Sequence, residues 1–354
     1  MRIILVTDTP YPDADPAGRG VTTTLKALAD RLIDSGHEVG IIAAAPGLTT
    51  YKRSVVVRVN PLTKPGAQIR DALAIARPDL MIVLDPGRMG RKALKQGRRQ
   101  GTHTVVVQQR PVSSATEDYW RAKVADRADD LVVTAAWMVD RLAVMGVGAD
   151  LWLPGVDALA FTPALRDPWL HGSWSHAKRE PKIVVGYAGG LTHRHGIRRL
   201  AELSELRDVR PVIIGGGAQA GWLKGHLPHA RFTGPLATGD LAIALATLDV
   251  LVHPGEDETC CHVLREASAS GVPVVAPHAG GAADVVRHLE SGLLYEPGSA
   301  GGLADAVAAV AADPQRALLG AHGRMLALGR DWQVAVDELL ERVIRPGVVQ
   351  ASAR

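Results

Sequence analysis

Short apolar runs alternate with segments of helical periodicity along most of the chain, and this alternation limits the possible fold more than any other feature. The first run is Ile3–Val6, and Leu25, Leu28 and Leu32 follow it at helical spacing. Strands that are apolar throughout are buried on both faces, which is typical of a parallel sheet between two layers of helices. Further strands are expected at 39–43, 55–59, 80–84, 103–107 and 131–134, and helices at 67–76 and 91–100.

Residues 150–182 interrupt this alternation with Pro-rich turns and a polar run, 171–180. The pattern then restarts, and strands are expected at 183–187, 212–214, 230–233, 250–253 and 274–276. A length of 354 residues also fits two domains. We therefore expect two doubly wound Rossmann-like domains, 1–155 and 156–331, which face a shared cleft, while a C-terminal helix at 332–345 packs back on the first domain.

Composition excludes several classes of protein. The two cysteines, Cys260 and Cys261, are adjacent, which argues against a disulfide framework or a cysteine-based metal site. A net charge of +3 and an aromatic content of 4% argue against a nucleic-acid partner. The sequence has no apolar run of membrane-spanning length and does not begin like a signal peptide, so we expect a cytoplasmic protein.

Six basic residues fall within Arg88–Arg99. A cluster of this kind can attract anionic lipid headgroups at the inner face of a membrane. An ordinary solvated helix face explains it equally simply, and we favour that explanation at this stage.

The segment His253–Ala276 carries the strongest indication of chemistry. A strand ends, an acidic loop with Glu258 follows, and a short helix carries Glu266 eight positions later. Both carboxylates can therefore face one ligand. We expect this helix to start near Thr259, where its free N–H groups and its dipole suit a diphosphate. A carboxylate in the same pocket suits the hydroxyls of a sugar.

This segment, with its Gly271–Ala276 tail, resembles the donor site of retaining family 4 glycosyltransferases of the GT-B fold. Within that family it is most similar to actinobacterial GDP-mannose-dependent α-mannosyltransferases. The similarity extends along the chain, through Gly20–Thr22, Arg77–Asp79, Pro154–Asp157, Val185–Tyr187 and Phe232–Gly234.

The resemblance implies a role for each part of the site. Glu258 would contact the transferred sugar, and Glu266 would bind the ribose. The loop at Gly18 to Gly20 would contact donor phosphate or the acceptor. The backbone of Thr259, Cys260, Cys261 and His262 would hold the diphosphate, and the loop of Gly234, Pro235 and Leu236 would hold the base. The resemblance implies neither a metal nor a cofactor. Asp8, at the end of the first strand, is either a helix cap or an acceptor contact.

Two departures from the family pattern stand out. The family has an Arg and a Lys that neutralise the leaving diphosphate, where this chain has Gly190, after Gly189, and His195. Arg194 would restore one fixed charge, and His193 or His195 would add another when protonated. We therefore name Glu258, Arg194 and His195 as the candidate catalytic residues.

The second departure is Gln108–Pro111, where related mannosyltransferases have Gln-Thr-Asp or a nearby His that faces the acceptor. Pro111 supplies neither an acid nor a hydrogen-bond donor. This argues for a different acceptor, with Arg110 reaching toward it.

We expect a retaining enzyme that moves a hexose, with mannose from GDP-mannose as the best candidate, to a lipid-linked or soluble glycoside. Gly190 and Pro111 motivate an alternative, a catalytically silent GT-B protein that binds a nucleotide sugar or a glycan. A nucleotide-sugar epimerase is a third hypothesis.

Overall fold

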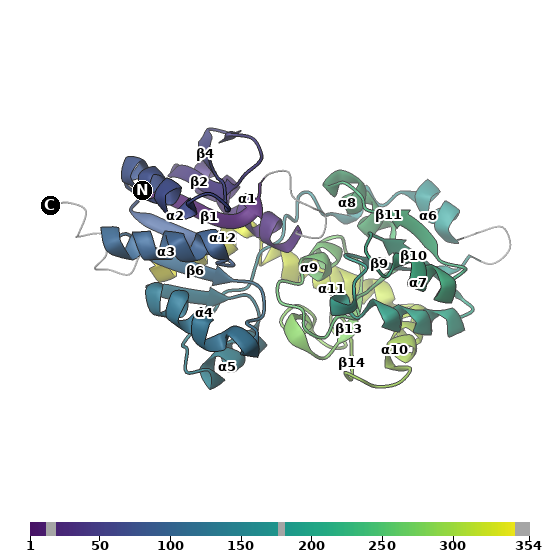
Figure 1. Ribbon diagram of the computed structural model, residues 1–354. Coiled ribbons are helices and arrows are strands. Elements are labelled where there is room, and N and C mark those ends of the chain that lie inside the picture. Colours follow the sequence, from purple (N-terminus) through teal and green to yellow (C-terminus); the bar gives the residue numbers. More distant parts are fainter. Residues whose placement is uncertain (12–18, 176–180, 344–354) are drawn as a thin grey trace. The chain divides into compact units, whose positions relative to one another are not determined.

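The computed structural model describes residues 1–11, 19–175 and 181–343, and the chain forms two compact units (Figure 1). The first unit runs from Met1 to Pro154 and includes the helix that begins at Trp332, and the second spans Gly155–Asp331. The first unit thus ends one residue before the expected boundary. Each unit has its own sheet and its own hydrophobic core. The shared cleft stays a prediction.

The sheet of the first unit has eight strands in the order β3-β4-β2-β1-β5-β6-β7-β8. All neighbours pair in parallel except β3 with β4. The strands are β1 (Arg2–Pro10), β2 (Glu38–Ala44), β3 (Thr50–Tyr51), β4 (Ser54–Val59), β5 (Leu80–Leu84), β6 (His103–Gln108), β7 (Asp130–Val133) and β8 (Asp150–Leu151). The order places later strands on both sides of β1, as a doubly wound sheet does.

Helices cover both faces of this sheet. They are α1 (Arg19–Asp34), α2 (Pro65–Ala76), α3 (Arg88–Gln100), α4 (Glu117–Lys123), α5 (Ala136–Val144) and α12 (Trp332–Val343). Ile3 and Leu5 pack with α1 and α12, whereas Ile4 and Val6 pack with α2, α3 and α5. Alternate residues of β1 are therefore buried on opposite faces, which explains why the strand is apolar throughout.

The C-terminal helix α12 belongs to the first unit. It lies against α1 in one hydrophobic cluster. Trp152, which follows β8, donates its indole N–H to the carbonyl oxygen of Ala335 over 2.7 Å. Its ring centroid is 6.4 Å from that of Trp332. A tryptophan whose N–H has a partner can be buried at little cost, so Trp152 anchors the returning helix.

The second unit has a six-stranded parallel sheet in the order β11-β10-β9-β12-β13-β14. Its strands are β9 (Ile183–Ala188), β10 (Val209–Ile214), β11 (Arg231–Gly234), β12 (Val250–Val252), β13 (Val274–Pro277) and β14 (Gly292–Tyr295). Its helices are α6 (Pro168–Ser175), α7 (Ala220–His226), α8 (Thr238–Thr247), α9 (His262–Ala269), α10 (Gly302–Ala312) and α11 (Arg316–Leu328).

Two buried clusters show that this second sheet is also covered on both faces. The prediction of two doubly wound α/β domains is therefore confirmed. The edge strand β14 was not predicted, because a four-residue strand that begins with glycine gives little periodic signal. Within the described residues, no helix is both long and apolar enough to span a bilayer.

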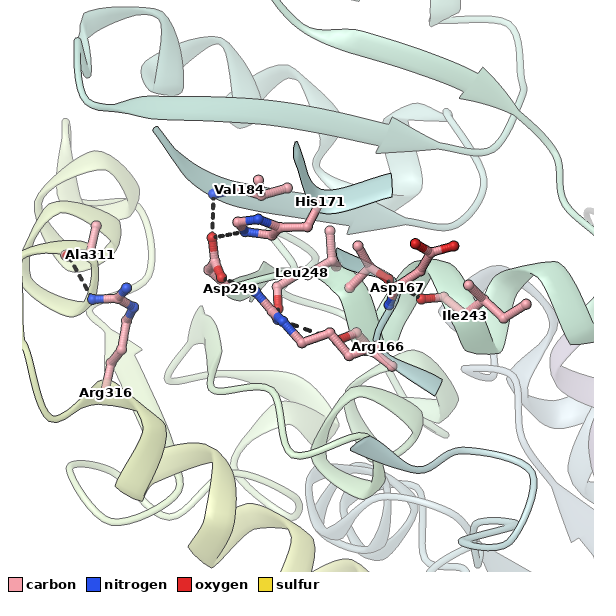
Figure 2. A network of polar contacts seen from close by, with 11 residues as sticks. Arg166, Asp167, His171, Val184, Ile243, Leu248, Asp249, Ala311 and Arg316 are labelled. Carbon is pink, nitrogen blue, oxygen red and sulfur yellow. Dashed lines mark hydrogen bonds and ion pairs between the residues drawn. The ribbon is translucent and has the colours of Figure 1, made fainter. Parts of the chain in front are cut away.

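Asp249 joins the start of the second unit to its sheet, at the amino ends of β9 and β12 (Figure 2). One carboxylate oxygen accepts from Arg166 over 2.7 Å. The other lies 2.9 Å from His171 Nε2 and accepts from the backbone N–H of Val184 over 2.9 Å. Burial opposes ionisation of Asp249, but the hydrogen bonds from His171, Val184 and Arg166 outweigh it, so its pKa is lowered. Asp249 therefore stabilises the unit in its ionised form.

We expect Asp249→Asn to lower the free energy of unfolding by about 1–3 kcal/mol at pH 7, because a charge-assisted network loses its acceptor charge. A carboxyl whose pKa is lowered by folding contributes stability above its unfolded pKa of about 3.9 and loses it as the pH falls. The difference between the variant and the natural protein should therefore shrink at pH 3. Urea unfolding at both pH values measures it.

Asp167→Asn is the matched control. Asp167 caps α6 by accepting from the backbone of Trp169 and Leu170, and asparagine can cap a helix equally well. A loss of stability in Asp249→Asn that is the same at pH 3 and pH 7 would contradict the assignment.

Candidate functional site

Three loops meet at the carboxyl ends of β9, β10 and β11 in the second unit. Gly189 donates its N–H to Ile214, Leu191 to Gly216, and Gly215 to Gly234, over 2.8–2.9 Å. These bonds continue the parallel pairing beyond the ends of the strands. The loops that carry Gly189, Gly190, Gly234, Pro235 and Leu236 therefore form one connected platform at this edge of the sheet.

Glycine is required where two of these loops touch. A Cβ atom on Gly215 would stand 1.9 Å from the carbonyl oxygen of Gly189, and one on Gly217 would stand 2.5 Å from that of Leu191. Both glycines also have positive φ, 139° and 152°. The Gly215–Gly217 run is thus explained by the close approach of two backbones.

The loop between β12 and α9 lies against a second pair of glycines. Gly281 donates its N–H to the carbonyl oxygen of Glu258 over 2.7 Å. A Cβ on Gly280 would lie 2.5 Å from the carbonyl oxygen of Glu256, and Gly280 has φ 56°. Sequence reasoning missed this pair. The only indication in the sequence was that Gly280 and Gly281 come just after the β13 strand.

Glu258 is the centre of the polar contacts in this loop. Its Oε1 lies 2.5 Å from Nδ1 of His195 and 3.8 Å from Nε2 of His253. Burial disfavours its charge, but His253, His195 and Arg194 together lower its pKa to about 2. Glu258 is therefore an ionised carboxylate, and two of the three candidate catalytic residues, Glu258 and His195, are in direct contact.

His253 was not among the predicted site residues, although it follows the β12 strand directly. Its ring is almost fully buried, and burial lowers its pKa. Its Nδ1 accepts the backbone N–H of Gly255 over 3.2 Å, so the proton of the neutral ring is on Nε2. The ligand atoms of His195, His253 and Glu258 lie within 4.8 Å of one another, a spacing that suits a metal ion. A metal ion bound at this nitrogen would have to displace the Nε2 proton of His253.

Tyr187 anchors the loop after β9 through a hydrogen bond. Its hydroxyl donates to the carbonyl oxygen of Gly190 over 2.9 Å, and burial raises its pKa far above the ordinary value, so it stays neutral. Gly190 itself is not at positive φ. A Cβ there would stand 3.4 Å from Nε2 of His195, which is an ordinary contact. The backbone at Gly190 therefore accepts a side chain, and the imidazole lies over the place where that side chain would begin.

The helix α9 begins at His262, so the prediction of a start near Thr259 was wrong. Cys261 is its N-cap residue and adopts a left-handed conformation, φ 48°, which ends the helix at this point. Both cysteines are buried, and burial raises the pKa of Cys261, so its thiol is neutral. Glu266 lies in the middle of α9 and is half-buried. Arg265, one position before it, is buried and donates to the carbonyl oxygen of Cys260 over 3.2 Å.

Arg199 ties the acidic loop to its surroundings. It lies on the 3₁₀ helix η6 (Ile197–Glu205), which directly follows the short 3₁₀ turn η5 (His193–His195). Its guanidinium contacts Glu202 over 3.1 Å and Glu256 over 3.3 Å, and it lies 5.0 Å from the ring centroid of Tyr295. The segment with His195 and the loop with Glu258 are thus linked by a charge-assisted contact, which the sequence did not reveal.

In the first unit, Asp8 has a structural task. Its carboxylate accepts the backbone N–H groups of Gly87, Met89 and Gly90 over 2.6–2.8 Å. Asp8 therefore caps the N-terminus of α3 from the end of the β1 strand. This structural role explains the residue without a contact to the acceptor. Gly20 lies in the first turn of α1, and no atom of the described residues stands within 4 Å of the Cβ it lacks. Gly18 lies outside the described residues.

Arg110 is held at the end of β6 by Asp85. The Asp85 carboxylate accepts from the backbone N–H groups of Gln109 and Arg110 over 2.6 and 2.9 Å, and it lies 3.5 Å from Nε of Arg110. Asp85 has φ 43°, an uncommon conformation for a residue other than glycine. The Arg110 side chain remains exposed, beside the half-buried Pro111.

Comparison with known proteins identifies the family. Residues 172–324 match the family described as Glycosyl transferases group 1. The chain is 33% identical to a GDP-mannose-dependent alpha-mannosyltransferase of Mycolicibacterium smegmatis, with 96% of each chain covered. It is 30% identical to a protein of the same name from Corynebacterium glutamicum, with 84% of this chain and 77% of that protein covered.

Solved structures agree on the fold. A crystal structure of Anabaena Alr3699/HepE in complex with UDP and glucose has a TM-score of 0.77 at 18% identity, and covers 97% of this chain and 99% of that one. WaaG, a glycosyltransferase involved in lipopolysaccharide biosynthesis, has a TM-score of 0.69 at 15% identity, with 97% and 99% covered. Two Rossmann-like units with these neighbours are the GT-B fold. Sequence and fold together show that the chain belongs to the group 1 glycosyltransferases.

Proposed function

We propose that this glycosyltransferase transfers mannose from GDP-mannose, with retention, to a lipid-linked or soluble glycoside. The observation that carries the proposal is the ionised carboxylate of Glu258, held by His195 at the carboxyl edge of the second sheet. The chain that carries this carboxylate is also 33% identical, over almost its whole length, to proteins named GDP-mannose-dependent alpha-mannosyltransferase. Those relatives favour transfer over the silent binder and the epimerase.

In this proposal the second unit binds the donor. Glu258 contacts the transferred sugar, Glu266 pairs with the ribose hydroxyls, and the loop of Gly234, Pro235 and Leu236 holds the base. The backbone from Thr259 through Cys260 and Cys261 to His262 faces the diphosphate, together with Gly189 and Gly190. Front-face transfer needs positioning and stabilisation of the leaving charge, and these groups supply both without a metal or a cofactor.

The acceptor belongs to the first unit in this proposal. Arg110 is the exposed residue within the Gln108–Pro111 departure, and Asp85 restricts its backbone. A guanidinium in this position suits hydroxyls or an anionic group of a glycoside. Gly20 contacts donor phosphate or the acceptor from the first turn of α1, and the same role is assigned to Gly18, which lies outside the described residues.

We further propose that α3 brings the protein to the inner face of an anionic membrane. Arg88, Lys92 and Lys95 are exposed along this helix. The guanidinium of Arg91 lies 5.3 Å from the ring centroid of Tyr119, whose side chain is 53% exposed. Basic groups beside an exposed aromatic ring suit the headgroup region of a bilayer. The membrane would then present a lipid-linked acceptor.

For the donor site, Glu266→Ala should weaken GDP-mannose binding by about 10- to 100-fold, because charge-assisted hydrogen bonds of roughly 1.5–3 kcal/mol are lost. Calorimetry measures the affinity. Glu205→Ala removes an exposed carboxylate at the end of η6 and should leave the affinity unchanged. An unchanged affinity in a folded Glu266→Ala protein would refute the ribose assignment.

For the diphosphate loop, Arg194→Ala should lower the transfer rate far more than it weakens binding of guanosine, because charge builds up on the leaving diphosphate in the transition state. Gly190→Arg should raise turnover, since the backbone at Gly190 accepts a side chain. Steady-state transfer of labelled mannose measures both.

Arg198→Ala is the matched control for this experiment. Arg198 is a neighbouring exposed arginine that contacts Gln219 over 3.2 Å instead of the site. Transfer rates that do not change in Arg194→Ala would show that other groups stabilise the diphosphate.

For the membrane, Lys92→Glu combined with Lys95→Glu should reduce binding to phosphatidylglycerol vesicles by at least about tenfold, because each basic group near an anionic surface contributes about 1 kcal/mol. Co-sedimentation measures binding. Arg207→Glu with Arg287→Glu changes the net charge equally on the second unit and serves as the control. Equal loss in both pairs, or no binding of the natural protein, would refute the role of α3.

A further inference from the structure

The loop after β6 holds the backbone of Arg110 from both sides. Oδ1 of Asp85 accepts the backbone N–H groups of Gln109 and Arg110 over 2.6 and 2.9 Å. The side-chain amide of Gln108 donates to the carbonyl oxygen of Arg110 over 2.6 Å. Pro111 follows, and a proline restricts the backbone of the residue before it. The Arg110 side chain therefore leaves the loop in a defined direction.

The other oxygen of the same carboxylate faces the Arg110 side chain. Oδ2 of Asp85 lies 3.5 Å from Nε of Arg110. The Asp85 side chain is 6% exposed, whereas that of Arg110 is 55% exposed, so the buried carboxylate meets the inner end of an exposed guanidinium. Within the described residues, the two terminal nitrogens of Arg110 have no hydrogen bond or ion pair. They are therefore the part of this side chain that can bind a ligand.

The residue type at position 85 shows which of these contacts needs a charge. Asp85 has φ 43° and precedes Pro86, a combination that few residues tolerate. Asparagine also tolerates the left-handed conformation, and its single amide oxygen can accept both backbone N–H groups. The loop by itself therefore needs no charge at this position, and a buried carboxylate costs more than a buried amide. What the carboxylate adds is a second oxygen, and that oxygen faces Arg110.

We propose that Asp85 is the positioning residue of the site for the acceptor glycoside, and that it orients Arg110 so that the two terminal nitrogens donate to neighbouring hydroxyls of the acceptor sugar. The proposal rests on the proposed function. Asp85 is buried and acts through Arg110 without touching the sugar. A side chain that is ordered beforehand loses less conformational entropy on binding. Because Asp85 compensates the charge of Arg110, the pair suits hydroxyl oxygens better than a free anion.

Steady-state transfer of labelled mannose from GDP-mannose to octyl β-D-glucoside and octyl α-D-mannoside tests this proposal. Asp85→Asn keeps the oxygen that accepts the two backbone N–H groups and replaces the oxygen that faces Arg110 with an N–H donor. We expect the KM for the glycoside to rise about 3- to 10-fold, because an unrestrained side chain has to be ordered on binding. The kcat, the KM for GDP-mannose and the Tm should hardly change.

A double-mutant cycle separates positioning from a structural role. Arg110→Ala should raise the KM for the glycoside at least as much, and Asp85→Asn should add nothing in the Arg110→Ala background. An effect through the structure of the loop would persist without the Arg110 side chain. Asp129→Asn is the matched control, since Asp129 accepts the backbone N–H of Thr104 over 2.8 Å at the opposite end of β6. This variant should keep the KM values of the natural protein.

A second measurement needs no glycoside. Nuclear magnetic resonance of the arginine Nε–H groups should show that the Arg110 Nε–H exchanges slowly with solvent in the natural protein and loses this protection in Asp85→Asn. Equal exchange in the two proteins would overturn the positioning role.

The kinetic outcomes separate this proposal from the proposed function. An unchanged KM in Asp85→Asn beside a raised KM in Arg110→Ala would overturn the role of Asp85 and leave Arg110 at the acceptor. An unchanged KM in both variants would overturn the proposal while mannose transfer itself still supports the proposed function. If the natural protein transfers mannose to neither glycoside, the proposed function fails and this proposal fails with it.

Discussion

Apart from the short edge strand β3, the strands of each sheet in this protein are parallel and must be covered by helices on both faces, and this requirement determines where the polar residues lie. A parallel connection has to cross back over the sheet before the next strand begins, so the parallel strands of a unit all point their carboxyl ends to the same edge. In the second unit this brings the loops after β9, β10, β11 and β12 together, although the first and the last of them begin more than sixty residues apart. The site is a consequence of burying two faces of one sheet.

Much of the fold follows from the sequence for the same reason. A strand buried on both faces has to be apolar throughout, and such runs are easy to recognise, as Leu80–Leu84 shows. Short strands at the edges of the sheets are harder to recognise in the sequence. The edge strand β14 is short and begins with Gly292, and β8 has only two residues. The start of α9 was misplaced because Cys261 adopts a left-handed conformation, which local sequence preference does not favour in cysteine.

The site was only partly predictable. The spacing of Glu258 and Glu266 indicated the segment, and the position of His195 was visible in the loop. The groups that give these residues their properties come from elsewhere in the chain. Arg199 reaches Glu256 from a separate element, and Gly280 permits a backbone approach that no pattern around Glu258 describes. His253 is informative only when its buried ring is seen beside Glu258. Tertiary contacts of this kind leave no periodic trace in the sequence.

The two departures in the loop after β9 also make sense as one arrangement. In isolation, the absence of a side chain at Gly190 and the presence of a histidine at position 195 are two lost charges. In the structure the imidazole of His195 lies over Gly190, and its far side is fixed by Glu258. A long cationic side chain at position 190 would begin beside that ring. The glycine and the histidine therefore suit each other, and the carboxylate that orients the ring is the one assigned to the transferred sugar.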